Sequence, residues 1–141
     1  IVRAGDLSPN ASGLERGQSF VEARAGNATT TYALRVLPGP VDDASVENGE
    51  QSAPVLTSFP LPIVVTAVDR FDNGVGGVGV TFNPIAGPSG ASGVAVQSSV
   101  TTDEAGEAAT SVSANGTAGT WTLRVTVSGL GTLDLPMTNT P

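Results

Sequence analysis

The amino-acid sequence predicts an all-β protein, an antiparallel β-sandwich of about seven strands preceded by an N-terminal β-hairpin. From residue 63 to residue 140, short runs alternate apolar and polar residues, as strands do when one face is buried. Asp, Asn and Gly separate these runs and favour turns. With 39% hydrophobic and 13% charged residues, the composition favours folding over disorder. A chain of this length can bury roughly 68–70% of its unfolded surface.

The first forty residues predict a separate β-hairpin. Residues 17–26 can be overlaid on residues 119–128, and the following strand then places Tyr32 on Leu133. An isolated hairpin is marginally stable in water, so this one is expected to dock on its own sandwich, on a preceding domain, or on a neighbouring copy. The residues predicted to form the docking interface are Phe20, Val21, Ala23, Tyr32, Leu34 and Val36.

A stiff linker is predicted between the hairpin and the sandwich. Pro38 and Pro40 restrict the backbone and remove two hydrogen-bond donors from residues 37–43. This composition divides the chain into a hairpin segment, residues 1–40, and an Ig-like sandwich, residues 41–141.

The sandwich strands follow in order along the chain. They are predicted at residues 44–47 with 52–57, 63–69, 78–83, 94–101, 107–114, 119–128 and 130–138. Phe82 and Trp121 are predicted to face the core. Residues 70–77 form a hairpin or a sheet-crossing turn, and a turn at 102–106 is expected to join neighbouring strands. About seven strands at this spacing are typical of an Ig-type sandwich.

The residue types that are missing exclude most catalytic chemistry. The chain contains no His, no Cys and no Lys, and its six cations are all Arg. A Ser-His-Asp or Cys-His nucleophile and an ordinary zinc site are therefore excluded. Paired carboxylates could suggest a glycosidase, but the chain has few aromatic residues to line a sugar cleft. We expect no enzymatic activity.

The net charge of −7 argues against nucleic acid and against anionic membrane surfaces as partners. No run of 18 apolar residues is present, so no membrane insertion is expected. The N-terminus lacks the pattern of a signal peptide. If the protein is secreted, the sequence is a mature chain or an excised piece.

The sequence suggests two kinds of binding site. Asp42, Asp43 and Glu47 near the linker could supply oxygen ligands to calcium, although solvated charge is the alternative. Other acidic residues in turns are expected to accept local backbone hydrogen bonds. Tyr32 and Phe71 are the candidate platforms for a glycan, and the alternative for Phe71 is a plug over the sandwich end.

Residues 65–69, 73–82, 102–108 and 119–121 resemble bacterial Ig-like domains of the invasin/intimin type. The resemblance covers about residues 46–140 and implies modules without active sites that form rigid rods at the bacterial cell surface. In that family the turn after Asp is usually Gly-Asn-Pro-Val, whereas here Asp72 is followed by Asn73, Gly74 and Val75. The missing proline is expected to loosen this turn.

These observations lead to three functional hypotheses. The first is a non-catalytic extracellular spacer whose partners are adjacent Ig-like domains. The second is a subunit of a surface filament that binds copies of itself through the N-terminal hairpin. The third is a module that binds a glycan or a receptor.

Overall fold

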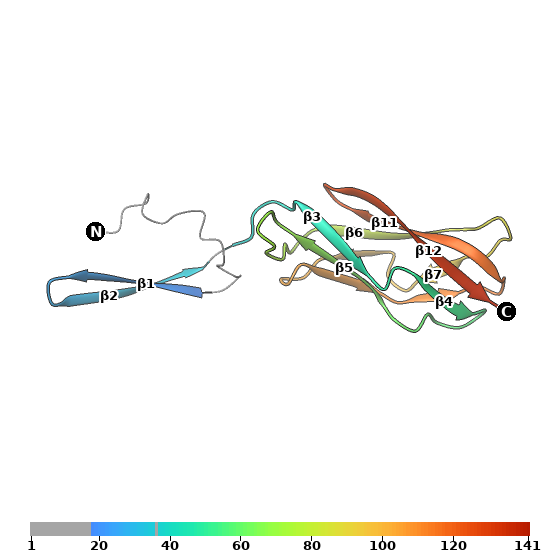
Figure 1. Cartoon of the computed structure of the whole chain (residues 1–141), viewed down its shortest axis with the longest axis horizontal. Helices are drawn as coiled ribbons and strands as arrows, with labels where there is room; N and C mark the ends of the chain where they lie inside the picture. Colours follow the sequence, from blue (N-terminus) through green and yellow to red (C-terminus); the bar gives the residue numbers. More distant parts are fainter. Residues whose placement is uncertain (1–17, 36) are drawn as a thin grey trace.

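The computed structural model describes residues 18–35 and 37–141, and in this part of the chain the regular structure consists of β-strands (Figure 1). β1 (Gln18–Ala25) and β2 (Ala28–Arg35) form the N-terminal hairpin. The sandwich contains β3 (Asp43–Glu47), β4 (Gln51–Pro54), β5 (Ile63–Val68), β6 (Gly79–Ile85), β7 (Gly93–Ala95), β8 (Ser99–Thr101), β9 (Glu107–Thr110), β10 (Val112–Ala114), β11 (Gly119–Val127) and β12 (Gly131–Thr140).

Two main sheets make up the sandwich. One has the strand order β4-β12-β11-β6-β8, and the other has the order β3-β5-β9. β7 and β10 form a short additional pair, and every pairing is antiparallel except that of β4 with β12. The predicted all-β Ig-like sandwich is confirmed. Within the described residues, no helix is long and apolar enough to cross a membrane.

The core lies between the two sheets, as the alternation of apolar and polar residues along the strands predicts. Trp121 is 3% exposed and Phe82 is 1% exposed, so both predicted core positions are confirmed. Phe59 packs edge-on against the Trp121 ring, with centroids 6.0 Å apart. Each fully buried side chain of this size contributes roughly 1.5–3 kcal/mol of hydrophobic stabilisation.

Residues 37–141 contain ten strands where about seven are predicted, because three predicted segments are each broken in two. The first segment begins in one sheet, where β3 pairs with β5, and continues in the other, where β4 pairs with β12. Asn48, whose φ is 59°, lies at the crossing. Local alternation does not reveal this change of sheet, because both halves bury one face.

The two segments that flank the turn at 102–106 are also broken, and their predicted pairing is confirmed only for their outer halves, where β7 pairs with β10. β8 pairs with β6 and β9 pairs with β5, so the turn connects opposite sheets. Thr110 marks the break: its hydroxyl donates to the Gln97 carbonyl at 2.9 Å and accepts from the Gln97 N–H at 3.0 Å. These bonds replace backbone pairing where the strands part.

Residues 70–77 form the sheet-crossing turn that was one of the two predicted alternatives, since β5 and β6 lie in different sheets. This turn contacts the 102–106 turn closely. A Cβ atom at Gly74 would lie 2.0 Å from the Ala105 carbonyl oxygen, and one at Gly106 would lie 2.4 Å from the Ala67 carbonyl oxygen. Only glycine fits such an approach.

The N-terminal hairpin lies beyond the end of the sandwich where the linker enters, and the C-terminus lies at the opposite end (Figure 1). The register pairs Val21 with Tyr32, while Leu123 pairs with Leu135. If β1 is overlaid on β11 as predicted, Tyr32 therefore matches Leu135 and not Leu133. The predicted overlay of the second strand is wrong by two residues, because the two hairpins have turns of different length.

Candidate functional site

Asp69, at the end of β5, is the centre of a hydrogen-bonded cluster at the linker end of the sandwich. Asp69 is only 3% exposed. One carboxylate oxygen accepts from the backbone N–H groups of Phe71 (2.8 Å) and Asn73 (3.0 Å), and the other accepts from Gly39 at 2.9 Å. The Asn73 amide donates to both oxygens. Asp69 therefore organises its own turn and also holds the linker.

The pKa of Asp69 reflects this arrangement. Burial raises the pKa, but the hydrogen bonds from Gly39, Asn73 and Phe71 outweigh burial and lower it to about 2. The carboxylate is thus ionised at neutral pH and binds these donors strongly.

The linker is held at two points. Gly39, between Pro38 and Pro40, donates to Asp69, and the Asp42 N–H donates to the Val68 carbonyl at 2.8 Å. The two prolines restrict the backbone on either side of the first point. We call the Asp69–Gly39 hydrogen bond the linker anchor.

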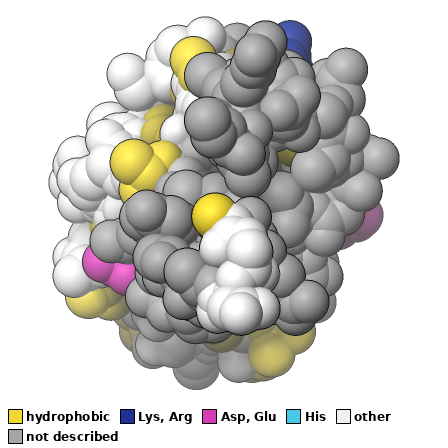
Figure 2. All heavy atoms as spheres, turned by 90° about the vertical axis from the view of Figure 1, so that its left-hand side faces the viewer, with side chains coloured by type: hydrophobic (Ala, Val, Ile, Leu, Met, Phe, Trp, Pro, Cys, Tyr) yellow, Lys and Arg dark blue, Asp and Glu magenta, His cyan; other side chains and the backbone are white. Residues whose placement is uncertain are grey.

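A shallow cavity of about 380 Å³ adjoins the linker anchor, lined by residues 39–42 and 69–71. Phe71 in its wall is 51% exposed, and the Arg70 guanidinium lies 4.5 Å from the centre of its ring. The interpretation of Phe71 as a plug is therefore wrong, because the ring remains open to solvent. Seen from this end, hydrophobic side chains are visible in several small groups among the described atoms (Figure 2).

The three predicted calcium ligands are spread along the edge of the sandwich. Asp43 and Glu47 lie at the two ends of β3, about 13 Å apart at about 3.3 Å per residue. One Asp43 oxygen accepts from the Ala44 N–H at 2.8 Å. Among the described residues, no group of three or more acidic, His or Cys side chains is placed to hold a metal ion. Calcium binding remains a prediction, and its most compact donor pair is Asp42 with Asp43.

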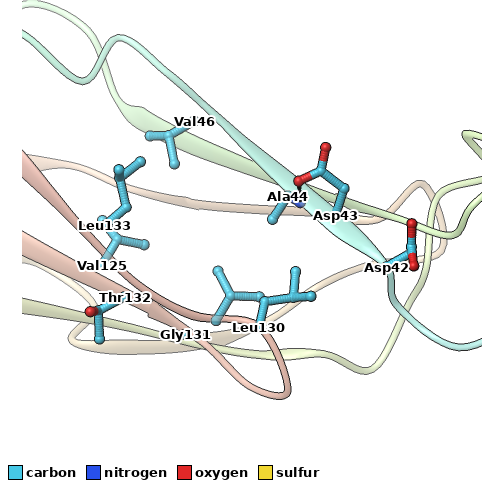
Figure 3. Close-up of a pocket in the computed structure, with 10 residues that line it drawn as sticks. Asp42, Asp43, Ala44, Val46, Val125, Leu130, Gly131, Thr132 and Leu133 are labelled. Atoms are coloured by element: carbon cyan, nitrogen blue, oxygen red, sulfur yellow. Dashed lines mark hydrogen bonds between the residues drawn. The ribbon is translucent and has the colours of Figure 1, made fainter.

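These two carboxylates stand at one end of a groove between β3 and the β11–β12 hairpin. The groove has a volume of about 310 Å³. Val46 and Leu133 point toward one another across its other end, and Leu130 lies between (Figure 3). β4 covers β12 only from Met137 to Thr140, so the first part of β12 has β11 as its one strand neighbour in the described sheet.

The acidic turn at Asp103 behaves as expected. Its carboxylate accepts from the N–H groups of Ala105 (2.8 Å) and Glu107 (3.0 Å). These are the local backbone bonds that an Asp supplies in a turn.

Asn139 near the C-terminus is a structural residue that the sequence analysis missed. It is 2% exposed, and it accepts from the Trp121 indole N–H at 2.7 Å. Its amide donates to the carbonyls of Ser92 (2.8 Å) and Thr117 (3.0 Å) and to the Asn115 side chain (3.0 Å). The nearby Trp121 was the available signal, because a buried indole N–H needs an acceptor.

The predicted docking residues of the hairpin are placed only by their backbone. Val21, Ala23, Tyr32 and Leu34 occupy positions on one face of the β1–β2 ladder, and Phe20 occupies a position on the other. Val36 lies outside the described residues.

Comparisons with known proteins support the fold. No protein-family model and no curated protein sequence matches the chain. Among solved structures, Yersinia pseudotuberculosis adhesin InvE matches with a TM-score of 0.55 and 18% identity, over 89% of this chain and 40% of that chain. Surface layer protein SbsC, domains 1–6, matches with a TM-score of 0.50 and 19% identity, over 88% and 16%.

The D0-D1 domain of intimin also matches, with a TM-score of 0.48 and 18% identity, over 85% of this chain and 59% of that chain. The chain spans less than two thirds of each of these structures. Residues 37–141 are about three quarters of the chain, so the match to InvE extends into the segment that contains the hairpin. At these identities the matches to InvE and SbsC support the fold alone.

Proposed function

We propose that the chain is a non-catalytic structural module of a bacterial surface adhesin or a similar surface array, located outside the cell, and that it acts as a rigid spacer between neighbouring modules. The linker anchor carries this proposal. It holds the incoming chain within four residues of the end of β2, and burial limits the access of water to Asp69. A spacer needs this kind of fixed joint.

Two further observations support a module within a rod. The linker enters at one end of the sandwich and the chain leaves at the other (Figure 1). The match to SbsC covers 16% of a chain of six domains, which is about one domain. The names of the two better-matched structures, an adhesin and a surface layer protein, are consistent with a surface location.

The stiffness of the joint can be measured in the full chain. Because the protein contains no Cys, Asn27→Cys and Ser128→Cys provide a unique pair of spin-label sites, one in the hairpin turn and one in the β11–β12 turn. We expect a single narrow distance distribution. Asp69→Asn keeps the shape of the side chain but replaces one of its two acceptor oxygens with an NH2 group and removes its charge. The side chain then cannot accept from Gly39 and from its own turn together, and the distribution should broaden.

Asp72→Asn is the matched control, because Asp72 lies in the same turn and is exposed. It should leave the distribution narrow. A broad distribution in the unmodified chain would contradict the spacer function.

A second candidate is a filament subunit whose hairpin binds a neighbouring copy. Residues 1–36 contain four of the six Arg and three of the thirteen acidic residues, so they carry a net charge of +1 and the remainder carries −8. This asymmetry favours attraction between the hairpin segment of one copy and the sandwich of another. The partly unpaired edge of β12 is a place where a strand could be added.

That edge also has features that oppose strand addition. Pro136 has no N–H, and Asp134 is held by Arg124 in a two-point ion pair with distances of 2.7 and 2.8 Å. Electron microscopy with light scattering over a concentration series decides between the candidates. Ordered polymers that disappear when residues 1–36 are removed would favour the filament, and a constant monomer mass favours the spacer.

Two ligand proposals rest on single features. The half-exposed Phe71 beside its cavity could stack on a sugar, and a glycan screen with Phe71→Ala as control tests this.

Calcium at Asp42 and Asp43 would stiffen the same linker. A rise in melting temperature with calcium that Asp42→Asn and Asp43→Asn together abolish would support that site.

A further inference from the structure

Leu56 occupies a backbone conformation that disfavours its side chain. It lies in the turn after β4, which is closed by a hydrogen bond from the Thr57 N–H to the Pro54 carbonyl at 3.2 Å. Its φ is 61°. At the third position of such a turn a positive φ favours Gly or Asn, because a branched side chain crowds the neighbouring backbone.

Packing within the sandwich does not explain the residue either. Leu56 is 79% exposed, the highest value among the exposed large hydrophobic residues of the described chain. The leucine therefore gains little from burial and loses conformational free energy. Residues held in sparsely populated backbone regions cluster at functional sites.

Leu56 lies where the chain leaves the sandwich. The Val55 N–H donates to the Thr140 carbonyl at 2.9 Å, and the Leu56 N–H donates to the Asn115 carbonyl at 3.2 Å. The Asn115 side chain is itself fixed, accepting from Ser92 and Thr117 and donating to the Gly90 carbonyl. The exposed leucine is thus mounted on a rigid end of the module, next to its last strand.

The opposite end of the module also exposes apolar side chains. Leu37 is 68% exposed and Phe71 is 51% exposed, both close to the linker anchor. The two ends of the sandwich therefore carry different apolar groups, as a head-to-tail contact between successive modules requires.

We propose that Leu56 is the anchor of a contact with the linker end of a following sandwich of the same type, in which it packs against the surface around Phe71. This inference rests on the proposed function, since it needs an array of modules. It names the partner surface and explains why a strained, exposed leucine is present. The contact adds a second restraint to the joint that the linker anchor already holds.

A tandem fusion tests the contact. Residues 39–141 are joined directly after Pro141 of the full chain, so that Pro141 takes the place of Pro38 before Gly39. The second copy keeps every strand of the sandwich and the whole described core. Ser99→Cys in each copy places one spin label on β8 of each module. We expect one narrow distance distribution, which Leu56→Asn in the first copy broadens.

The same substitution should have no adverse effect on the single chain. Asn tolerates a positive φ better than Leu, so Leu56→Asn should leave the melting temperature of the 141-residue chain unchanged or raise it. Val96→Thr is the control for loss of an exposed apolar group, because Val96 is 71% exposed. It should change neither measurement.

The outcomes separate the inference from the function. A narrow distribution that Leu56→Asn leaves unchanged overturns the contact alone. A clear loss of melting temperature in the single chain also overturns it, because Leu56 would then be held by its own sandwich. A broad distribution in the unsubstituted fusion overturns both the contact and the rigid spacer.

Discussion

The carboxylate of Asp69 accepts a hydrogen bond of 2.9 Å from the backbone N–H of Gly39, a residue thirty positions earlier in the chain. The bond joins the end of a core strand to the linker. Because the same carboxylate also accepts from Phe71 and Asn73, it cannot move without disrupting its own turn. The direction in which the linker leaves the sandwich is therefore coupled to the stability of the sandwich.

This coupling predicts a stability change at acid pH. The folded-state pKa of Asp69, about 2, lies below its ordinary value of 3.8. Its contribution is thus present above about pH 4 and is lost as the pH falls through 2. We expect roughly 2–3 kcal/mol of stability to depend on this group. Urea unfolding between pH 2 and pH 7 measures it.

Asp69→Asn should lower the free energy of unfolding at pH 7 by about that amount and flatten the curve between pH 4 and pH 2. Asp72→Asn should keep the slope of the unmodified chain. Equal slopes for Asp69→Asn and the unmodified protein would assign the acid sensitivity to other carboxylates, such as Asp134, whose pKa the bond and charge of Arg124 lower.

Gly74 should not tolerate a side chain. Its Cβ would lie 2.0 Å from the Ala105 carbonyl oxygen, which is backbone and cannot turn away. We expect Gly74→Ala to lower the free energy of unfolding by about 3 kcal/mol, at the upper end for overpacking. Gly77→Ala is the control: Gly77 has a φ of 82° and open space around it, so it should lose only about 1–2 kcal/mol. Equal losses of unfolding free energy in the two variants would mean that backbone conformation, and not the close contact with Ala105, excludes a side chain from this turn.

The sequence predicted which residues face the core, but it predicted the strand pairing across the 102–106 turn only in part, for β7 with β10. Trp121 and Phe82 follow from the two-residue period of a strand, which is a local property. The pairing of β8 with β6 and of β9 with β5 depends on contacts between distant segments. Alternation is the same for a strand that stays in one sheet and for one that crosses to the other, so the breaks could not be predicted.

The residues of the candidate site also divide into those that local sequence predicts and those that depend on distant contacts. The turn around Asp69 was predicted, because the residues at 69–73 favour a turn locally. The bond to Gly39 was not, since nothing near position 39 indicates a donor that a distant carboxylate would bind. Leu56 gave no signal either: its importance lies in its backbone angle and its exposure, which only the three-dimensional structure provides.

Asn139 should be essential for the C-terminal end of the sandwich. Asn139→Ala leaves the Trp121 indole N–H without its acceptor at a buried position. It also removes the amide that links Ser92, Asn115 and Thr117. We expect a loss of roughly 2–4 kcal/mol. Trp121 is the only Trp in the chain, so its fluorescence reports the change directly.

Thr138→Ala on the same strand is the matched control and should cost less than about 1 kcal/mol. If both variants lost the same free energy, the network around Asn139 would be no more important than an ordinary strand position.

Removal of residues 1–36 should leave a folded sandwich. Among the described side chains, every buried hydrophobic residue lies between Ala53 and Met137, and the linker anchor at Gly39 is retained. We therefore expect the shortened chain to melt cooperatively, at a temperature within a few degrees of that of the full chain. Calorimetry measures this transition. Loss of a cooperative transition would mean that the hairpin is part of this sandwich. A retained transition together with fewer copies per particle in light scattering would mean that the hairpin binds another copy. A retained transition with no change in oligomeric state is the result expected for a module whose hairpin belongs to the neighbouring domain of an array.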